Sequence, residues 1–246
     1  MKKRKVVLLG DSITQGLGSK KINFTEKLSA LLGNDFSVKN MALTGTTILY
    51  AREIMPEIIA ERPDYVVIVY GNVDAQIRPN QKGRIFPYIP KRFQHNGMLM
   101  PRPFYSRTWW KQAGQKVDNF LRHLFSQLIY MVDGSEQWVS LREFVSVYKA
   151  VIMELKKSGC QVIACSTVYI DEKKFPGSLI EYDNFNRALS DLSVKEKIRY
   201  LDIYSPLKSN VLKLGWGKIY CYDHFHPNMG GYLIIAERIA NMIKNN

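Results

Sequence analysis

Cysteine is scarce in this sequence. The three cysteines, Cys160, Cys165 and Cys221, are too few and too odd in number for a disulfide framework. Free thiols are therefore expected, and with them a reducing, cytoplasmic compartment. Long hydrophobic runs are also absent, since only the four apolar residues 6–9 separate the basic opening segment from Gly10. That run is too short for the core of a signal peptide, and no segment approaches the length of a membrane span.

Signatures of nucleotide and metal binding are missing as well. The chain has no Walker loop, no Gly-x-Gly-x-x-Gly after a strand, and no cysteine or histidine pairs at the spacing of a zinc site. We therefore expect neither a cofactor nor a metal. Apolar residues make up 46% and charged residues 23% of the 246 residues, which is ordinary for a globular protein. This length predicts a single domain over residues 1–246.

Acidic residues are few relative to basic ones, 22 against 35, which gives a net charge of +13. Such a charge suits nucleic acid, a membrane surface or an anionic substrate. The excess is concentrated between residues 78 and 122, where Asp118 is the only acid. The basic residues there are Arg78, Lys82, Arg84, Lys91, Arg92, Arg102, Arg107, Lys111, Lys116 and Arg122. Interleaved with them are the aromatic residues Phe86, Tyr88, Phe93, Phe104, Tyr105, Trp109 and Trp110, and the prolines Pro79, Pro87, Pro90, Pro101 and Pro103.

This basic and aromatic segment is predicted to be an insertion at about residues 76–140, and its role stays open. A compact domain seldom carries so long an irregular loop unless the loop is functional. One hypothesis is a lid or platform for a large substrate, with rings suited to stacking on sugars. Another is an insertion packed on the domain with a solvated basic face. Binding of nucleic acid without catalysis uses the same features, but no recognised nucleic-acid motif accompanies them, so nucleic acid is not the expected partner.

Short β-branched and aromatic runs alternate with segments of helical periodicity. Strands are expected at residues 6–9, 36–42, 64–70, 161–167 and 198–204, and helices at residues 23–32, 48–59, 108–131, 138–157, 180–197 and 231–243. Strands that alternate with helices form a parallel sheet covered on both faces. The expected fold is a three-layer α/β/α sandwich with a five-stranded parallel sheet in flavodoxin-like order.

The first strand runs directly into Gly10-Asp11-Ser12-Ile13-Thr14. Ligands in open α/β sheets bind at the carboxyl ends of the strands, so this turn would present the Ser12 hydroxyl at the rim of the sheet. The alternative is that Ser12 only caps the following helix, since serine is a favoured N-cap.

A second motif, Asp223-His224-Phe225-His226-Pro227-Asn228, precedes the last helix. A serine hydroxyl needs a base to take its proton, and the base needs a carboxylate to fix its tautomer. Asp223 and His226 lie three residues apart, so one tight turn could present both. Asp223, His224 and His226 could also ligate a metal, but that leaves the serine motif unexplained. Cys221 is expected to be a small neighbour of this loop.

These two motifs resemble those of the SGNH or GDSL-type esterase and lipase family. The resemblance implies that Ser12 is the nucleophile, His226 the general base and Asp223 its orienting carboxylate. His224 competes as the base, but it lacks the Pro-Asn that follows the family's catalytic histidine. The resemblance also implies an oxyanion hole formed by the backbone N–H groups of Ser12 and Gly45.

The third motif, Gly71-Asn72-Val73-Asp74, departs from the family's Gly-x-Asn-Asp, because the asparagine stands one residue early. Either Asn72 reaches the oxyanion hole through a changed turn, or the hole depends on backbone N–H groups alone. Asp11 and Asp74 are predicted to contact the substrate. The expected activity is cleavage of carboxylic esters, with an O-acetyl or other short acyl group on a carbohydrate or small molecule. The alternative is an acyltransferase that moves acyl groups on polysaccharide.

Overall fold

The computed structural model describes residues 3–19, 24–94, 99–100 and 108–245. Its central sheet contains five parallel strands in the order β2–β1–β3–β6–β7. These strands are β1 (Arg4–Gly10), β2 (Phe36–Asn40), β3 (Tyr65–Val69), β6 (Gln161–Cys165) and β7 (Arg199–Leu201). The expected α/β fold with a parallel sheet in flavodoxin-like order is therefore confirmed.

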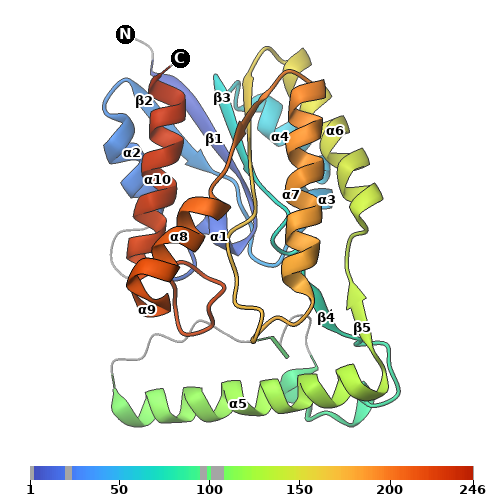
Figure 1. Cartoon of the computed structure of the whole chain (residues 1–246). Helices are drawn as coiled ribbons and strands as arrows, with labels where there is room; N and C mark the ends of the chain where they lie inside the picture. The colour runs from blue at the N-terminus through green and yellow to red at the C-terminus, as the bar shows by residue number, and fades with distance from the viewer. Residues whose placement is uncertain (1–2, 20–23, 95–98, 101–107, 246) are drawn as a thin grey trace.

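Helices cover both faces of the sheet (Figure 1). On one face, α2 (Phe24–Leu32) packs against α10 (Met229–Lys244); on the other lie α3 (Ile48–Glu53), α6 (Leu141–Lys157) and α7 (Ser178–Lys195). Helix α6 shows why these segments are helical, because Phe144, Val151 and Leu155 recur at helical spacing and are fully buried. The central strand β3 is buried along its whole length, as expected for a strand covered on both faces.

Two segments differ from the expected elements. Residues 48–59 form α3 and then a separate helix, α4 (Met55–Ala60), since Pro56 in the first turn of α4 has no N–H to continue the earlier helix. The last strand does not run directly into the Asp223 loop. Two helices, α8 (Tyr204–Leu214) and α9 (Trp216–Ile219), lie between them.

The insertion begins and ends in a short antiparallel strand pair, β4 (Ile77–Pro79) with β5 (Ser135–Gln137). Between these strands, α5 (Trp109–Val132) runs across the bottom of the molecule in Figure 1, below the carboxyl ends of the sheet strands. A small apolar cluster, separate from the main core, joins α5 to the preceding loop through Ile89, Phe93, Leu99 and Ile129. Part of the basic and aromatic segment lies outside the described residues, namely Pro101, Arg102, Pro103, Phe104, Tyr105 and Arg107. Within the described ranges, no helix has the length and hydropathy to cross a bilayer.

Two basic residues of the insertion do not belong to a solvated face. The Arg78 guanidinium is buried 3.8 Å over the Trp138 ring and donates to the Val73 carbonyl at 2.9 Å. Its burial lowers the Arg78 pKa to about 10. Arg122 is also buried and is paired with Asp118 at 2.7 Å. Arg78 thus anchors the loop that leaves β3, and Arg122 joins α5 to the preceding loop, since its guanidinium lies 5.1 Å from the centroid of the Phe93 ring.

Candidate active site

The turn after β1 places Ser12 at the start of the short helix α1 (Ser12–Gln15). Asp11 is the N-cap of this helix, because its carboxylate accepts the Ile13 N–H at 2.8 Å. Ser12 is therefore not the cap, and its hydroxyl is available for other contacts. Gly10 permits the tight turn, since a Cβ at this position would lie 2.0 Å from Thr14 Oγ1.

The loop that carries the aspartate and histidine is closed by backbone pairing. Tyr220 and Pro227 form an isolated antiparallel bridge, and the Cys221 N–H donates to the His226 carbonyl at 2.9 Å. Inside the loop, Asp223 Oδ1 accepts the N–H groups of Phe225 and His226, each at 3.1 Å. These bonds fix the Asp223 carboxylate relative to the His226 ring.

The two motifs, more than two hundred residues apart in sequence, meet at the carboxyl end of β1. Ser12 Oγ lies 2.9 Å from His226 Nε2, and His226 Nδ1 lies 2.6 Å from Asp223 Oδ2. Asp223 is fully buried, while Ser12 and His226 keep 4% and 7% exposure. Gly18 brings the segments together, because a Cβ there would lie 2.4 Å from the Pro227 carbonyl. A serine, an imidazole and a carboxylate thus form one continuous hydrogen-bonded series.

His224 belongs to a different cluster. Its Nδ1 lies 2.7 Å from Asp171 Oδ2, and its ring stacks on Trp216 with centroids 4.5 Å apart. Burial lowers the His224 pKa. The side chains of His224 and His226 have different carboxylate partners, so the two rings and Asp223 do not converge as a set of metal ligands would. Cys221 is a buried neighbour of the loop, as expected.

The Asn72 side chain is buried between three loops. Its Nδ2 group donates to Asp11 Oδ2 at 3.1 Å and to the Val69 carbonyl at 3.4 Å, and its Oδ1 accepts the Val168 N–H at 2.8 Å. The amide is fully buried and directed at these partners. This geometry favours the alternative in which backbone N–H groups, rather than Asn72, would face an oxyanion.

Asp11 and Asp74, expected to contact substrate, are both fully buried. Asp74 accepts the N–H groups of Ile48 at 2.8 Å and Gly71 at 3.0 Å, which joins the start of α3 to the end of β3. Burial raises the pKa of Asp11 to about 6, and burial together with the charge of Asp11 raises the pKa of Asp74 to about 7. Neither carboxylate is exposed, and both hold neighbouring backbone segments in place, so the predicted contact of Asp11 and Asp74 with substrate stays a prediction.

A family model for the GDSL-like lipase/acylhydrolase family matches residues 8–234 of the chain. The chain belongs to this family. This family membership confirms the expected enzyme class, a carboxylic ester hydrolase. None of the curated protein sequences matches the chain significantly.

Similar solved structures share the fold at low sequence identity. A catalytic mutant of Axe2, an acetylxylan esterase from Geobacillus stearothermophilus, is 16% identical with a TM-score of 0.66, covering 99% of this chain and 95% of its own. A lipase/acylhydrolase from Enterococcus faecalis is 17% identical with a TM-score of 0.62, and the match covers 98% of this chain and 96% of the other. A putative GDSL-like lipase from Parabacteroides merdae is 12% identical with a TM-score of 0.62, and the match covers 99% of this chain and 96% of the other. Catalytic mutants of Axe2 include separate alanine replacements of a serine, an aspartate and a histidine.

In this family member, Gly45 lies in an exposed turn with φ of +79°, a conformation that favours glycine. Among the described residues, and apart from its two chain neighbours, no atom lies within 4 Å of where its Cβ would be. The turn is held to the end of β1 by the Leu43 N–H, which donates to the Gly10 carbonyl at 3.1 Å. Ser12 is the first residue of α1, and the first N–H groups of a helix have no acceptor within it.

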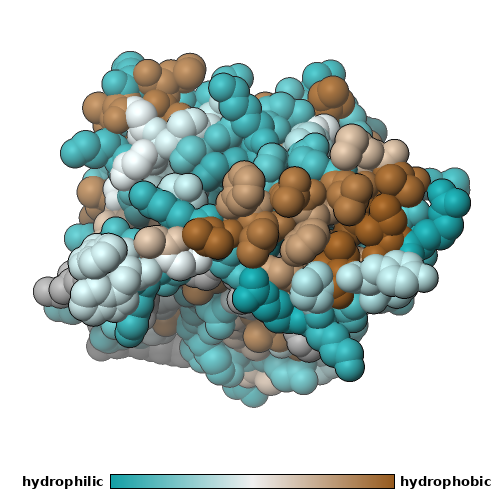
Figure 2. All heavy atoms as spheres, turned by 90° about the horizontal axis from the view of Figure 1, so that it is seen from below, coloured by the Kyte–Doolittle hydropathy of each residue, from teal (hydrophilic) through white to brown (hydrophobic). Residues whose placement is uncertain are grey.

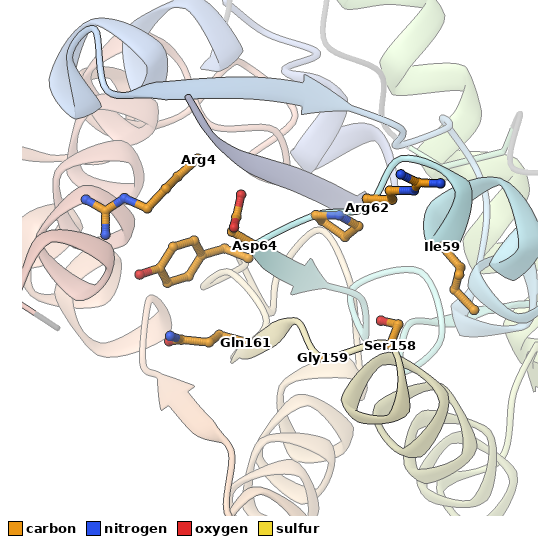
Figure 3. A pocket seen from close by; sticks show the side chains of 9 residues that line it. Arg4, Ile59, Arg62, Asp64, Ser158, Gly159 and Gln161 are labelled. Carbon is orange, nitrogen blue, oxygen red and sulfur yellow. The ribbon is translucent and has the colours of Figure 1, made fainter. Parts of the chain in front are cut away.

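A hollow of about 680 Å³ lies at the opposite end of the sheet (Figure 3). It is lined by side chains that include Arg4, Arg62, Asp64 and Gln161, which belong to the amino ends of strands or the loops before them. The series from Ser12 to Asp223 lies at the carboxyl ends, where open α/β sheets bind ligands. The hollow is therefore separate from the candidate site.

Proposed function

We propose that this GDSL-family hydrolase is a serine esterase in which Ser12 is the nucleophile, His226 the general base and Asp223 the carboxylate that orients the base. One observation carries the proposal: Ser12 Oγ, the two His226 ring nitrogens and Asp223 Oδ2 are linked at 2.9 and 2.6 Å. This arrangement has the donor and acceptor order that an acyl-transfer triad requires.

The chemistry follows from that order. With Nδ1–H of His226 donating to Asp223, Nε2 is unprotonated and accepts the Ser12 proton as Oγ attacks the acyl carbonyl. The imidazolium then returns the proton to the leaving alcohol oxygen, which leaves an acyl ester on Ser12. Water attacks this ester with His226 again as the base, and the acid and free Ser12 are released.

The negative charge on the tetrahedral intermediate needs preorganised donors. We assign this role to the backbone N–H groups of Ser12 and Gly45, because Asn72 donates elsewhere. Each oxyanion donor is worth roughly 3 kcal/mol of transition-state stabilisation. Gly45 combines an exposed turn with open space on its Cβ side, which leaves room for a substrate carbonyl.

The substrate we propose is an O-acetyl or other short acyl ester of a carbohydrate or small molecule. The likeness to an acetylxylan esterase over nearly the whole length of both chains supports this class. The test compares hydrolysis of acetylated xylo-oligosaccharides and p-nitrophenyl acetate with that of p-nitrophenyl decanoate and palmitate. We expect preference for the acetyl esters, and a clear preference for the long chains would overturn the substrate class. Adding xylo-oligosaccharide acceptors separates hydrolysis, which releases acetate, from transfer, which forms a new sugar ester.

A further inference from the structure

Helix α5 buries mainly polar side chains, although Ile129 and the half-buried Leu121 and Phe125 pack in the small apolar cluster. Its buried residues are Asn119, Arg122, Ser126 and Ile129, of which only the last is apolar. Its exposed apolar residues are Trp109, Trp110, Val117, Phe120, Leu124, Leu128, Met131 and Val132. An ordinary surface helix turns its apolar side inward and its polar side to solvent. In α5 most of the apolar side chains are instead exposed.

The exposed residues form one continuous surface. Val117, Phe120, Leu124, Leu128 and Met131 are spaced three or four residues apart and therefore share one side of the helix, which we call the α5 stripe. The two exposed tryptophans at the start of α5 stand edge to face, with ring centroids 5.4 Å apart. Figure 2, seen from the α5 side, shows a continuous hydrophobic band across this face. Contiguous apolar patches on soluble proteins mark interaction surfaces.

The charges around the α5 stripe are basic. Lys111 and Lys116 are exposed on α5 itself. The acids of this region are neutralised, because Asp118 contacts Arg122 and Arg92, and Asp133 at the end of α5 contacts Arg84. Arg92 and Arg84 are themselves largely exposed. The exposed charges around the α5 stripe are therefore mainly basic, as is the net charge of +13 of the whole chain.

We propose that α5 docks the protein on an anionic lipid surface, with the α5 stripe in the interfacial layer and the flanking basic residues against lipid phosphates. Helices that lie in a membrane interface have this composition, with tryptophan, phenylalanine and leucine on one side and lysine or arginine beside them. Tryptophan rings favour the headgroup level. Lysine and arginine close to an anionic leaflet add attraction within a Debye length.

The charge pattern argues against a second copy of this chain on the α5 stripe. A two-fold interface brings the same surface of both subunits together, so the basic flanks of both copies would face each other. An anionic surface neutralises these flanks. A hollow of about 260 Å³ links α5 to the loop that carries Asp223 and His226, since it is lined by Lys116 and His123 of α5 together with Lys174 and with Tyr222 of that loop.

Vesicle sedimentation of the full chain tests the proposal. We expect binding to vesicles of equal parts phosphatidylglycerol and phosphatidylcholine, and much weaker binding to phosphatidylcholine alone. The double variant Leu124→Gln with Met131→Gln should lose at least about tenfold in affinity for anionic vesicles. Glutamine has a helix propensity close to those of leucine and methionine, so the helix is retained.

The matched control is the double variant Val194→Gln with Leu212→Gln. These two residues are 76% and 74% exposed on α7 and α8, outside the α5 stripe. We expect the control to bind vesicles as the wild type does, and both double variants to keep the wild-type circular dichroism spectrum. Equal binding by the two double variants would overturn the proposal. So would a wild type that binds no vesicle and instead forms a dimer that the α5 variant dissociates.

Discussion

Replacing Asp223 with asparagine isolates the function of one hydrogen bond. Asp223 Oδ1 accepts two backbone N–H groups, and an asparagine Oδ1 can keep both. The change falls on Oδ2, which lies 2.6 Å from His226 Nδ1 and would become an NH₂ donor. His226 must then carry its proton on Nε2, the nitrogen that faces Ser12 Oγ at 2.9 Å. In that tautomer the ring cannot accept the serine proton.

The expected loss in kcat for p-nitrophenyl acetate is about 10⁴-fold, equivalent to about 5.5 kcal/mol of barrier, with little change in KM. The loop should stay folded, because its backbone contacts remain. The matched control is Asp171→Asn. Asp171 also pairs with a histidine, His224, at 2.7 Å and also caps a backbone N–H, that of Lys173 at 3.0 Å. Its substitution should change kcat less than about threefold, since neither residue contacts Ser12. Activity of Asp223→Asn above about one tenth of wild type, or an equal loss in Asp171→Asn, would show that the bond from His226 to Asp223 does not set the catalytic tautomer.

Three further comparisons test other parts of the site and the fold. His226→Gln should abolish ester hydrolysis while His224→Gln retains it, in parallel assays on p-nitrophenyl acetate; loss in both would mean that the two rings act together. Gly18→Ala should lower Tm and activity, because Gly18 has φ of +117° and the new Cβ would lie 2.4 Å from a backbone oxygen. Gly33→Ala should have a far smaller effect, because Gly33 has φ of +84° but open space at its Cβ position. Its cost should be only about 1–2 kcal/mol of conformational strain. Asp74 has a folded pKa of about 7 against an ordinary value of 3.8, so the folded state retains the proton and stability falls as pH rises from about 4 to 7. Asp74→Asn should flatten that part of the denaturation profile, and an unchanged slope would show that Asp74 does not contribute.

The sheet and the two family motifs could be recognised in the sequence because each depends on local patterns. Buried strands and amphipathic helices show their period directly, and the motif with Ser12 and the one with Asp223 and His226 have distinctive spacing. Helices α8 and α9 were missed although Leu207 and Val211 have helical spacing. Pro56 is the local signal that residues 48–59 do not form one helix.

Contacts between distant segments could not be predicted in the same way. The bond from Asn72 to Asp11 joins residues 61 positions apart, and nothing local to either residue indicates it. Arg78 looked like part of a basic surface, yet it is buried over the Trp138 ring. Periodicity predicted α5, but the usual rule that the apolar side packs inward fails there, because Asn119 and Arg122 face the protein instead.

Hydrolysis of p-nitrophenyl acetate by wild type beside Ser12→Ala shows whether Ser12 is the nucleophile. A matched variant is Ser19→Ala, a serine of the same segment whose hydroxyl donates to the Gly16 carbonyl at 2.7 Å. We predict turnover by wild type and Ser19→Ala and background rates for Ser12→Ala, with wild-type folding in all three. Turnover by Ser12→Ala at the wild-type rate would contradict the account.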